Sequence, residues 1–324
     1  MPSVLEPSWI GRRVSVRRVT QRGPDGSLRT ADVVGDLLGL DAQTAVVDTR
    51  GGPVEVPVAH VVAARQAPTS TADELALEAV ATRGVRPADT EELGGWLLRA
   101  DHGFLRRANS VLPLRQLGLP LDEALARAHA WYAERGLPLV VATLPEARRL
   151  LDAGLGERGW EPVGESHVMA VRLDLVVTDP GAAADPRVEL AASPGDEWFA
   201  GFRGGSDVPA AGRALLARHD TVAFARLAEG GRTLAIGRGV VDDGWLGVSC
   251  VEVAPDARRQ GLAAAVMDAL SRWALARDAT RSYLQVEVDN AAAVALYGKL
   301  GYWVHHDYRY RLEPPPGFVP ERLW

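Results

Sequence analysis

A strand passes into a helix through the stretch Val251-Glu252-Val253-Ala254-Pro255-Asp256-Ala257-Arg258-Arg259-Gln260-Gly261-Leu262-Ala263-Ala264. The residues before Ala254 predict a strand, and the apolar stripe that starts at Leu262 predicts an amphipathic helix. A glycine turn here leaves unpaired main-chain N–H groups at the helix N-terminus, where the helix dipole adds positive potential. Such a turn can bind a pyrophosphate, and the small residues Gly261 and Ala263 permit close approach. Taken alone, a short glycine turn is also typical of a plain strand-to-helix connection.

A second motif, Asn290-Ala291-Ala292-Ala293-Val294-Ala295-Leu296-Tyr297-Gly298-Lys299-Leu300-Gly301-Tyr302, predicts a short helix. Asn290 is the expected N-cap, and Gly301 is the residue just past the helix end. Tyr297 lies about two turns after Asn290, near the same helix face. Alone, Tyr297 would be interpreted as a core aromatic. The order and separation of the two motifs favour a functional interpretation of both.

Together the two motifs resemble the signatures of the Gcn5-related N-acetyltransferase (GNAT) family, over about residues 187 to 313. The sequence departs from the family pattern at Ala263, where the family often has glycine. The resemblance implies an α/β fold with a mixed central sheet and the binding of acetyl-CoA as acyl donor. The residues implied to bind acetyl-CoA are Val251, Val253, Arg258, Arg259, Gln260, Gly261, Leu262, Ala263, Ala264 and Asn290.

The resemblance also implies how acetyl transfer would work. An amine with a pKa near 10.4 is mostly ammonium at neutral pH, so transfer needs a base, a donor for the developing oxyanion and a proton for the leaving thiolate. By resemblance Tyr297 is the acid, and the Val253 N–H points at the thioester carbonyl. Glu252 or Glu287 is the expected base, and Tyr297 with Glu252 is the predicted catalytic pair. Adjacent strand residues face opposite sides, so an ordinary solvated Glu252 is the alternative. Further candidate bases are His305 and His306.

Two other chemistries are disfavoured by the sequence. Cys250 has no base near it in sequence, so we expect direct attack of the amine in a ternary complex and not an acyl-cysteine. The histidines and acids lack the spacing of metal ligands, and no metal is predicted. The acceptor is expected to be a small amine or a protein amine. Its pocket is expected around Phe202, Arg203 and Asp207 and the hairpin loop 229–231, with the first half of the chain as a further contributor.

The sequence contains a degenerate second copy of both motifs. Gly156-Glu157-Arg158-Gly159-Trp160 corresponds to residues 298–302, and Arg115-Gln116-Leu117-Gly118-Leu119-Pro120 corresponds to residues 258–263. In the first copy Leu155 replaces Tyr297, Arg148 replaces Asn290, and Pro120 removes an N–H from the turn. The first copy should be catalytically silent, and the chain resembles tandem GNAT enzymes.

One polar stretch of the first half, residues 96–110, stands out. Its end, Arg107-Ala108-Asn109-Ser110, resembles bacterial GNAT proteins that carry an N-terminal SH3-like barrel. Two interpretations are open: Trp96, Arg107 and Asn109 form an acceptor pocket or domain interface, or the stretch is a hairpin whose arginines pair with acids such as Glu91 and Glu92.

Short strands with turn residues between them predict a small all-β barrel at the N-terminus. The expected domains are an SH3-like barrel at 1–66, a degenerate GNAT-like domain at 71–178 and a catalytic GNAT domain at 187–313. Proline- and alanine-rich linkers separate them. The strands expected in the barrel are 13–19, 33–40, 44–49 and 54–62.

Composition limits the remaining function classes. The chain has 324 residues, 47% of them hydrophobic, a net charge of -6 and a single cysteine. Its start lacks the pattern of a secretory signal, so a cytoplasmic protein without membrane contact is expected. The acidic balance argues against nucleic-acid binding by the whole chain, although residues 1–30 are locally basic. Two alternatives to an enzyme are an acyl-CoA sensor, and an adaptor whose barrel binds nucleic acid or a protein partner.

Overall fold

The computed structural model describes residues 5–177, 179 and 181–313. The chain divides into two compact units, Met1–Ser70 and Thr71–Trp324. Each unit has its own hydrophobic core. In the described residues no helix is long and apolar enough to cross a membrane.

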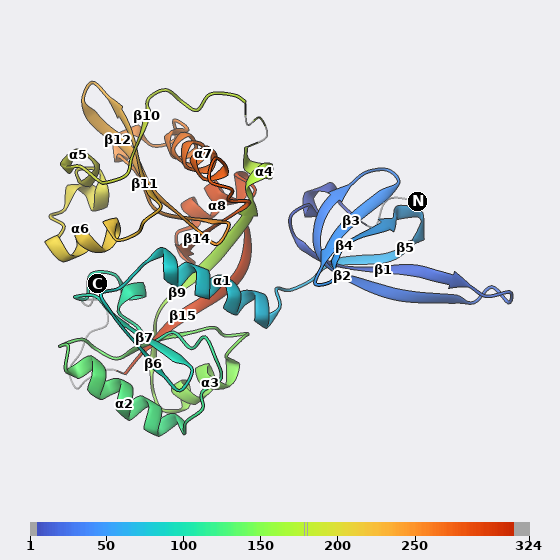
Figure 1. Cartoon of the computed structure of the whole chain (residues 1–324), viewed down its shortest axis with the longest axis horizontal. Helices are drawn as coiled ribbons and strands as arrows, with labels where there is room; N and C mark the ends of the chain where they lie inside the picture. The colour runs from blue at the N-terminus through green and yellow to red at the C-terminus, as the bar shows by residue number, and fades with distance from the viewer. Residues whose placement is uncertain (1–4, 178, 180, 314–324) are drawn as a thin grey trace. The chain divides into compact units, whose positions relative to one another are not determined.

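The first unit is a five-stranded antiparallel sheet in the order β4-β3-β2-β1-β5 (Figure 1). Its elements are η1 (Pro7–Trp9), β1 (Arg13–Arg22), β2 (Leu28–Leu40), β3 (Thr44–Thr49), β4 (Gly52–Pro57), η2 (Val58–His60) and β5 (Val61–Gln66). Fully buried Val14, Val16 and Val47 form part of its core, as their alternation along the strands requires.

Strands β1 and β2 extend beyond the expected ranges 13–19 and 33–40, and the structure differs from the sequence prediction for this unit in two further ways. The single strand expected over residues 54–62 is interrupted after Pro57, which has no N–H to donate to a ladder. The sheet is also open: within the described part of the chain, no pairing joins the two edge strands β4 and β5. A closed barrel is therefore not found.

The second unit is built on one eight-stranded sheet in the order β10-β11-β12-β13-β14-β9-β15-β8. Its strands are β8 (Val140–Thr143), β9 (Glu161–Arg172), β10 (Val188–Ala191), β11 (Val222–Glu229), β12 (Arg232–Asp242), β13 (Trp245–Val253), β14 (Arg281–Glu287) and β15 (Trp303–Leu312). A separate hairpin consists of β6 (Asp89–Leu93) and β7 (Trp96–Ala100). The fold is thus a mixed α/β fold.

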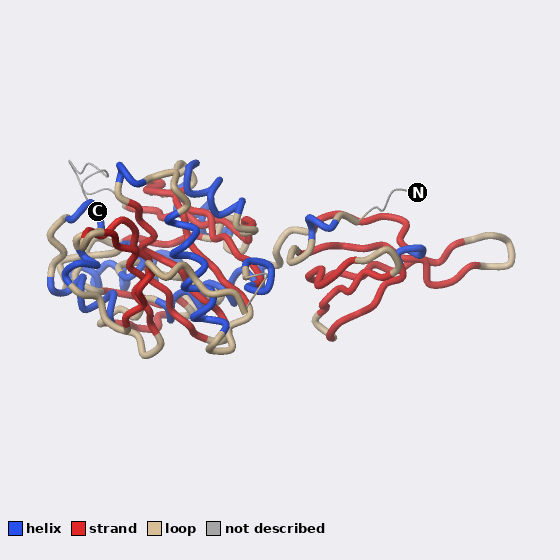
Figure 2. Tube along the Cα trace, turned by 90° about the horizontal axis from the view of Figure 1, so that it is seen from above, coloured by secondary structure: helices blue, strands red, loops and turns tan. Residues whose placement is uncertain are grey.

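Helices cover the sheet of the second unit (Figure 2). The α-helices are α1 (Thr71–Gly84), α2 (Leu121–Ala133), α3 (Arg149–Glu157), α4 (Leu173–Val176), α5 (Asp196–Phe199), α6 (Ala210–Ala217), α7 (Leu262–Leu275) and α8 (Ala291–Lys299). Short 3-10 turns are η3 (Arg106–Ala108), η4 (Phe202–Gly205) and η5 (Pro255–Ala257). Helix α7 lies against β12 so closely that a side chain at Gly237 would meet Val266 at 2.6 Å.

The second unit has two halves, residues 71–177 and 187–313, and these halves exchange strands. Strand β9 of the first half lies between β14 and β15 of the second half, while β15 lies between β9 and β8 of the first half. Each half therefore completes the sheet of the other. The regions 71–178 and 187–313, expected as successive domains, share one sheet.

The two halves also correspond element by element near their ends. Helices α3 and α8 are each nine residues long, and each is followed by a glycine with positive φ, Gly159 at 77° and Gly301 at 91°. Each glycine leads into the exchanged strand. Leu155 is fully buried in α3, at the place that Tyr297 takes in α8.

The polar stretch 96–110 does not form the hairpin that was one of its two interpretations. Strand β7 pairs with β6, which was not predicted, and residues 106–108 form the 3-10 turn η3 where a strand was expected. Single bridges, Leu97 to Leu112 and Val111 to Val141, connect the segment that follows to neighbouring strands. The segment acts as a loop that carries two arginines, Arg106 and Arg107, toward the second half.

Candidate active site

The main sheet separates between β13 and β14. Residues Trp245–Val248 of β13 pair in parallel with Arg281–Leu284 of β14. Beyond Val248 and Leu284 no pairing joins the two strands in the described structure. The cause lies in β13, where the register against β12 shifts and Cys250 takes a positive φ of 56°. Such a β-bulge bends its strand. Residues 249–253 thus leave one strand edge open.

The open edge presents main-chain groups. The Ala254 N–H donates to the Leu234 C=O on the β12 side at 2.8 Å. Successive strand residues direct their N–H groups to opposite sides, so the Val253 N–H faces the open edge. The side chains of Val251 and Val253 pack against the cluster that contains α7.

The predicted glycine turn lies beside this edge. Gly261 is the N-cap of α7 with a left-handed φ of 79°, and Arg259 also has a positive φ, 62°. The first hydrogen bond of the helix runs from the Ala265 N–H to the Gly261 C=O at 3.1 Å. Within the described residues, the amides of Leu262, Ala263 and Ala264 therefore have no intrahelical acceptor. The Arg258 side chain bonds weakly back to Val253 O, at 3.4 Å.

Helix α8 supplies the second motif. Asn290 is its N-cap, as expected, and the Asn290 side chain accepts from the Ala293 N–H at 3.2 Å. Tyr297 is 8% exposed and packs in the α7 cluster near Tyr302. Burial, with a smaller contribution from Cys250, raises the pKa of Tyr297 to about 12. The phenol therefore keeps its proton at neutral pH.

The two candidate bases lie in different places. The Glu252 carboxylate accepts from the main-chain N–H of Arg203 at 2.9 and 3.0 Å, on the opposite strand face from Val251 and Val253. Glu287, at the end of β14, instead lines a hollow beside the sheet opening.

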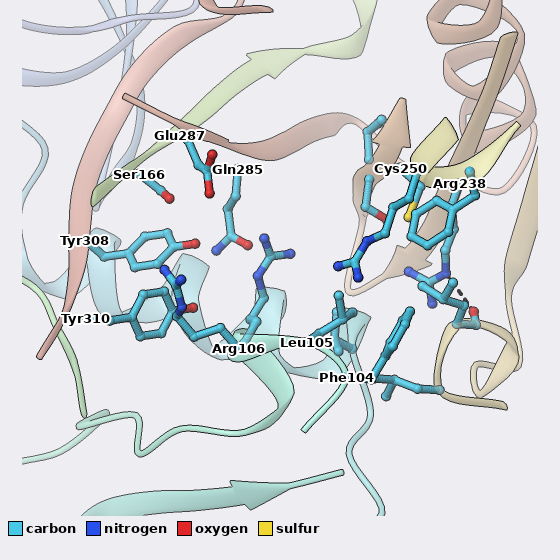
Figure 3. A pocket seen from close by; sticks show the side chains of 18 residues that line it. Phe104, Leu105, Arg106, Ser166, Arg238, Cys250, Gln285, Glu287, Tyr308 and Tyr310 are labelled. Atoms are coloured by element: carbon cyan, nitrogen blue, oxygen red, sulfur yellow. Dashed lines mark hydrogen bonds between the residues drawn. The ribbon is translucent and has the colours of Figure 1, made fainter. Parts of the chain in front are cut away.

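This hollow is a cavity of about 320 Å³ between the two halves of the second unit (Figure 3). Its walls include Tyr308 and Tyr310 of β15, Gln285 and Glu287 of β14, and Cys250 of β13. The rest of the lining is Val85, Phe104, Leu105, Arg106, Arg107, Ser166, Phe202, Arg203, Leu215, Leu216, Arg238, Val248 and Ser249. Figure 3 shows the tyrosines with Ser166, Gln285 and Glu287 on one side, and Cys250, Arg238 and Phe104 on the other.

The expected acceptor residues are only partly brought together. Phe202 and Arg203 line the cavity, but Asp207 does not. Gly231 of the hairpin loop lines a second hollow of about 430 Å³, which also holds Glu252 and Val253. Sequence reasoning missed Tyr308 and Tyr310, although their i, i+2 spacing on a strand indicates a shared face.

The residues singled out in the first half have different roles. Trp96 is 1% exposed and belongs to the core of the first half. Asn109 fixes its loop: its Oδ1 accepts from the N–H groups of Asp101 (2.7 Å) and Gly103 (2.9 Å). Arg107 lines the cavity. Glu92 pairs with Arg115 at 2.5 Å, so the structure does not bear out the interpretation in which Glu92 pairs with the arginines of 96–110.

The other candidate groups have structural partners. His306 is buried, and its Nε2 lies 3.1 Å from the Glu78 carboxylate. The Nδ1 atoms of His305 and His306 lie 2.8 Å apart. Burial raises the pKa of the Cys250 thiol, which disfavours the nucleophilic thiolate. Among the residues that the structure describes, no group of three or more His, Cys, Asp or Glu side chains could hold a metal ion.

Solved structures share this architecture. A GCN5-related N-acetyltransferase from Kribbella flavida aligns with a TM-score of 0.57 at 19% identity, covering 74% of this chain and 95% of its own. A tandem GNAT protein from the clavulanic acid biosynthesis pathway aligns with a TM-score of 0.50 at 13% identity, covering 76% of this chain and 90% of its own. The fold is that of the GNAT class of N-acetyltransferases.

Sequence relatives specify the family. Residues 69–311 match the family described as "Probable histone acetyltransferase Rv0428c C-terminal". The "Probable histone acetyltransferase Rv0428c" of Mycobacterium tuberculosis is 33% identical over 316 residues, covering 94% of this chain and 96% of the relative. The "Uncharacterized N-acetyltransferase YobR" of Bacillus subtilis is 28% identical over 228 residues, covering 69% of this chain and 92% of the relative. The chain belongs to this family, and it is an acyltransferase enzyme.

Proposed function

We propose that the chain is an N-acetyltransferase that moves the acetyl group of acetyl-CoA to a primary amine by direct attack in a ternary complex. The observation that supports this most is the open edge of β13 beside the unpaired amides of α7. A helix N-terminus attracts anions, and here it lies at the end of a strand whose main chain is free to bind an extended arm.

The residues of the two motifs would hold the donor. The main chain of Val251 and Val253 would pair with the pantetheine arm along the open edge. The amides of 259–264, with Arg258 beside them, would bind the pyrophosphate. Asn290 caps α8, the helix that carries Tyr297. Asn290 would contribute to donor binding by holding this helix, and with it Tyr297, in position.

Acetyl-CoA supplies the thioester, and the protein supplies the proton transfers. We assign the base to Glu287, because Glu252 is engaged by the Arg203 N–H and lines the second hollow, not the cavity between the two halves. Glu287, directly or through water, would take a proton from the ammonium. The Val253 N–H would stabilise the oxyanion as the C–N bond forms and the C–S bond breaks. Tyr297 would protonate the leaving thiolate.

The remaining parts of the chain would support this site. We propose that the first half, 71–178, is a catalytically silent GNAT copy, since Leu155 replaces the tyrosine and Pro120 occupies the N-cap of α2. The N-terminal sheet would be an SH3-like module that binds a protein partner. The setting would be the cytoplasm.

The test is an acceptor screen with purified protein and acetyl-CoA, read as free CoA. It would include small amines and a histone-tail peptide, because one relative is named a histone acetyltransferase. Amine-dependent CoA release supports the proposal. Acetyl-CoA binding without release for any amine would favour the sensor alternative.

A further inference from the structure

Four arginines line the cavity between the two halves of the second unit, and three of them are engaged by the protein. Arg238 is 3% exposed, and its guanidinium donates to Leu216 O at 2.7 Å and to Gly84 O at 3.3 Å. Arg106 donates to Val163 O and lies over the Tyr310 ring at 5.2 Å.

Arg203 is the third engaged arginine. Its guanidinium lies over the ring of Phe104 at 4.9 Å and over that of Phe202 at 5.4 Å. Such cation–π contacts leave the group on the cavity wall. It is held against an apolar surface between the two halves.

Arg107 differs from these three. In the part of the chain that the structure describes, its guanidinium has no hydrogen bond and no ion pair, and its buried Nε has no partner at all. Arg107 is half-buried as a residue, but its Nε is shielded from water, and a shielded cation without a partner is costly, so proteins normally pair such groups. The cavity that Arg107 lines is therefore where a partner would bind.

Hydrogen bonds on both sides of Arg107 fix the position of its loop. The turn Arg106–Ala108 is fixed by Asn109, whose side-chain Nδ2 donates to Leu105 O at 2.8 Å. The following residue, Ser110, is fully buried and accepts from Arg99 at 2.9 Å. These contacts position the loop, and Arg107 is the residue of the loop that lines the cavity without a bonding partner.

Among the residues that the structure describes, no acidic side chain forms an ion pair with Arg107. Burial disfavours its charged form, but nearby Tyr308, Tyr310, Tyr283 and Glu78 outweigh burial and keep its pKa above the ordinary value. Glu78 is itself bonded to His306 and is not within ion-pair distance of Arg107. Arg107 therefore stays cationic, with its fork available to an anion.

The strand β14 offers the complementary chemistry. The Gln285 Oε1 is buried without a hydrogen-bond partner among the described residues. The Glu287 carboxylate lies near it on the same wall (Figure 3). A carbonyl oxygen and a carboxylate accept hydrogen bonds, so this wall suits an amine or ammonium.

We propose that the acceptor is a small amino carboxylate, whose carboxylate binds Arg107 and whose amine faces Gln285 and Glu287. This inference rests on the proposed function and names the substrate class of the same site. A carboxylate fits better than a phosphate because one uncommitted guanidinium balances one negative charge, and its planar fork matches a carboxylate in two-pronged geometry. The cavity of about 320 Å³ has room for a small molecule.

The test compares amines with and without the anionic group. Suitable pairs are tyrosine with tyramine, 4-aminobutyrate with butylamine, and phosphoethanolamine with ethanolamine. Loss of one partner of a buried charge pair predicts that kcat/KM for the carboxylates exceeds that for the plain amines by about 30- to 1,000-fold. In Arg107→Met this preference should fall at least tenfold, and Arg107→Lys should restore part of it.

The preference of each variant is divided by that of the wild type. This ratio removes differences in amine reactivity, since each amine is the same in both assays. Arg127→Gln, an exposed arginine of α2, is the matched control and should keep the full preference. Thermal melting and acetyl-CoA titration report whether each variant is folded and loads the donor. If Arg107→Met fails to fold, Arg107→Lys decides.

Several outcomes would overturn the proposal. They are equal use of both members of each carboxylate pair, an unchanged preference in a folded Arg107 variant, and a preference for phosphoethanolamine alone. If no amine is turned over, binding of the same pairs is measured by calorimetry with and without CoA. Carboxylate binding that depends on Arg107 supports the inference even if the transfer reaction is absent, and its absence overturns the inference even if acetyl-CoA binds.

Discussion

At the scale of single residues, burial decides which groups can do chemistry. Tyr297 is buried with a pKa of about 12, so it holds a proton to give. The Cys250 thiol has a raised pKa, so it is a poor nucleophile at neutral pH. Glu252, predicted as base from its place in the motif, is engaged by the Arg203 N–H. Sequence alone could not show this contact, because the two residues are far apart along the chain.

Replacing Tyr297 by phenylalanine should lower kcat by roughly 10²- to 10⁴-fold, because the leaving thiolate loses its proton donor. The affinity for acetyl-CoA should change little, since the ring still packs in the α7 cluster. Steady-state kinetics and calorimetry on the same preparations measure both quantities. Unchanged kcat would remove Tyr297 from the mechanism.

The pH dependence gives an independent check on Tyr297. An acid is active in its protonated form, and with a pKa of about 12 nearly all of Tyr297 is protonated below about pH 10. The kcat profiles of wild type and Tyr297→Phe should therefore be parallel between pH 7 and about pH 10. A decline near pH 9 that occurs only in the wild type would contradict the assignment.

At the scale of elements, helix starts and caps could be predicted from the sequence, whereas the separation of two strands could not. The start of α7 at Leu262 and the Asn290 cap of α8 follow the sequence prediction, because glycine turns and caps act within a few residues. The opening between β13 and β14 depends on a bulge at Cys250. A bulge is a mismatch between two strands, and nothing in the sequence of one strand marks it.

The turn before α7 can be tested by Gly261→Val. A β-branched residue is strained at a φ of 79°, and the distorted turn should weaken acetyl-CoA binding by about tenfold or more. Gly159→Val is the matched control, since its φ is 77° and both glycines have open space around the added Cβ. Calorimetry should show weaker binding in the first variant only. Equal loss of affinity in both would mean that the effect is general strain.

At the scale of the whole molecule, the exchanged strands determine what can fold. The repeated motifs predicted two related halves, and the structure shows that β9 and β15 each lie between strands of the other half or complete its sheet. That arrangement requires partners far apart in sequence, which periodicity does not report. The candidate acceptor cavity follows from it, because Tyr308 and Tyr310 of β15 meet Arg107 of the first half there.

Strand exchange predicts that residues 187–313 do not fold alone. Without β9, strand β14 has an exposed edge and β15 loses both neighbours. The fragment should aggregate or lack a cooperative melting transition in circular dichroism, whereas 71–313 should melt cooperatively. Co-expression of 71–178 with 187–313 should restore a soluble complex. A monomeric fragment 187–313 that melts cooperatively and binds acetyl-CoA would contradict this prediction.

Calorimetric titration of the full chain with acetyl-CoA, beside S-acetylpantetheine, tests whether the amides around Gly261 hold the diphosphate of the donor. We predict saturable one-to-one binding of acetyl-CoA, with a dissociation constant between about 1 μM and 1 mM. S-acetylpantetheine, which lacks the diphosphate, should bind far more weakly. No heat from acetyl-CoA at millimolar concentration, or equal affinity for both compounds, would contradict the proposed donor site.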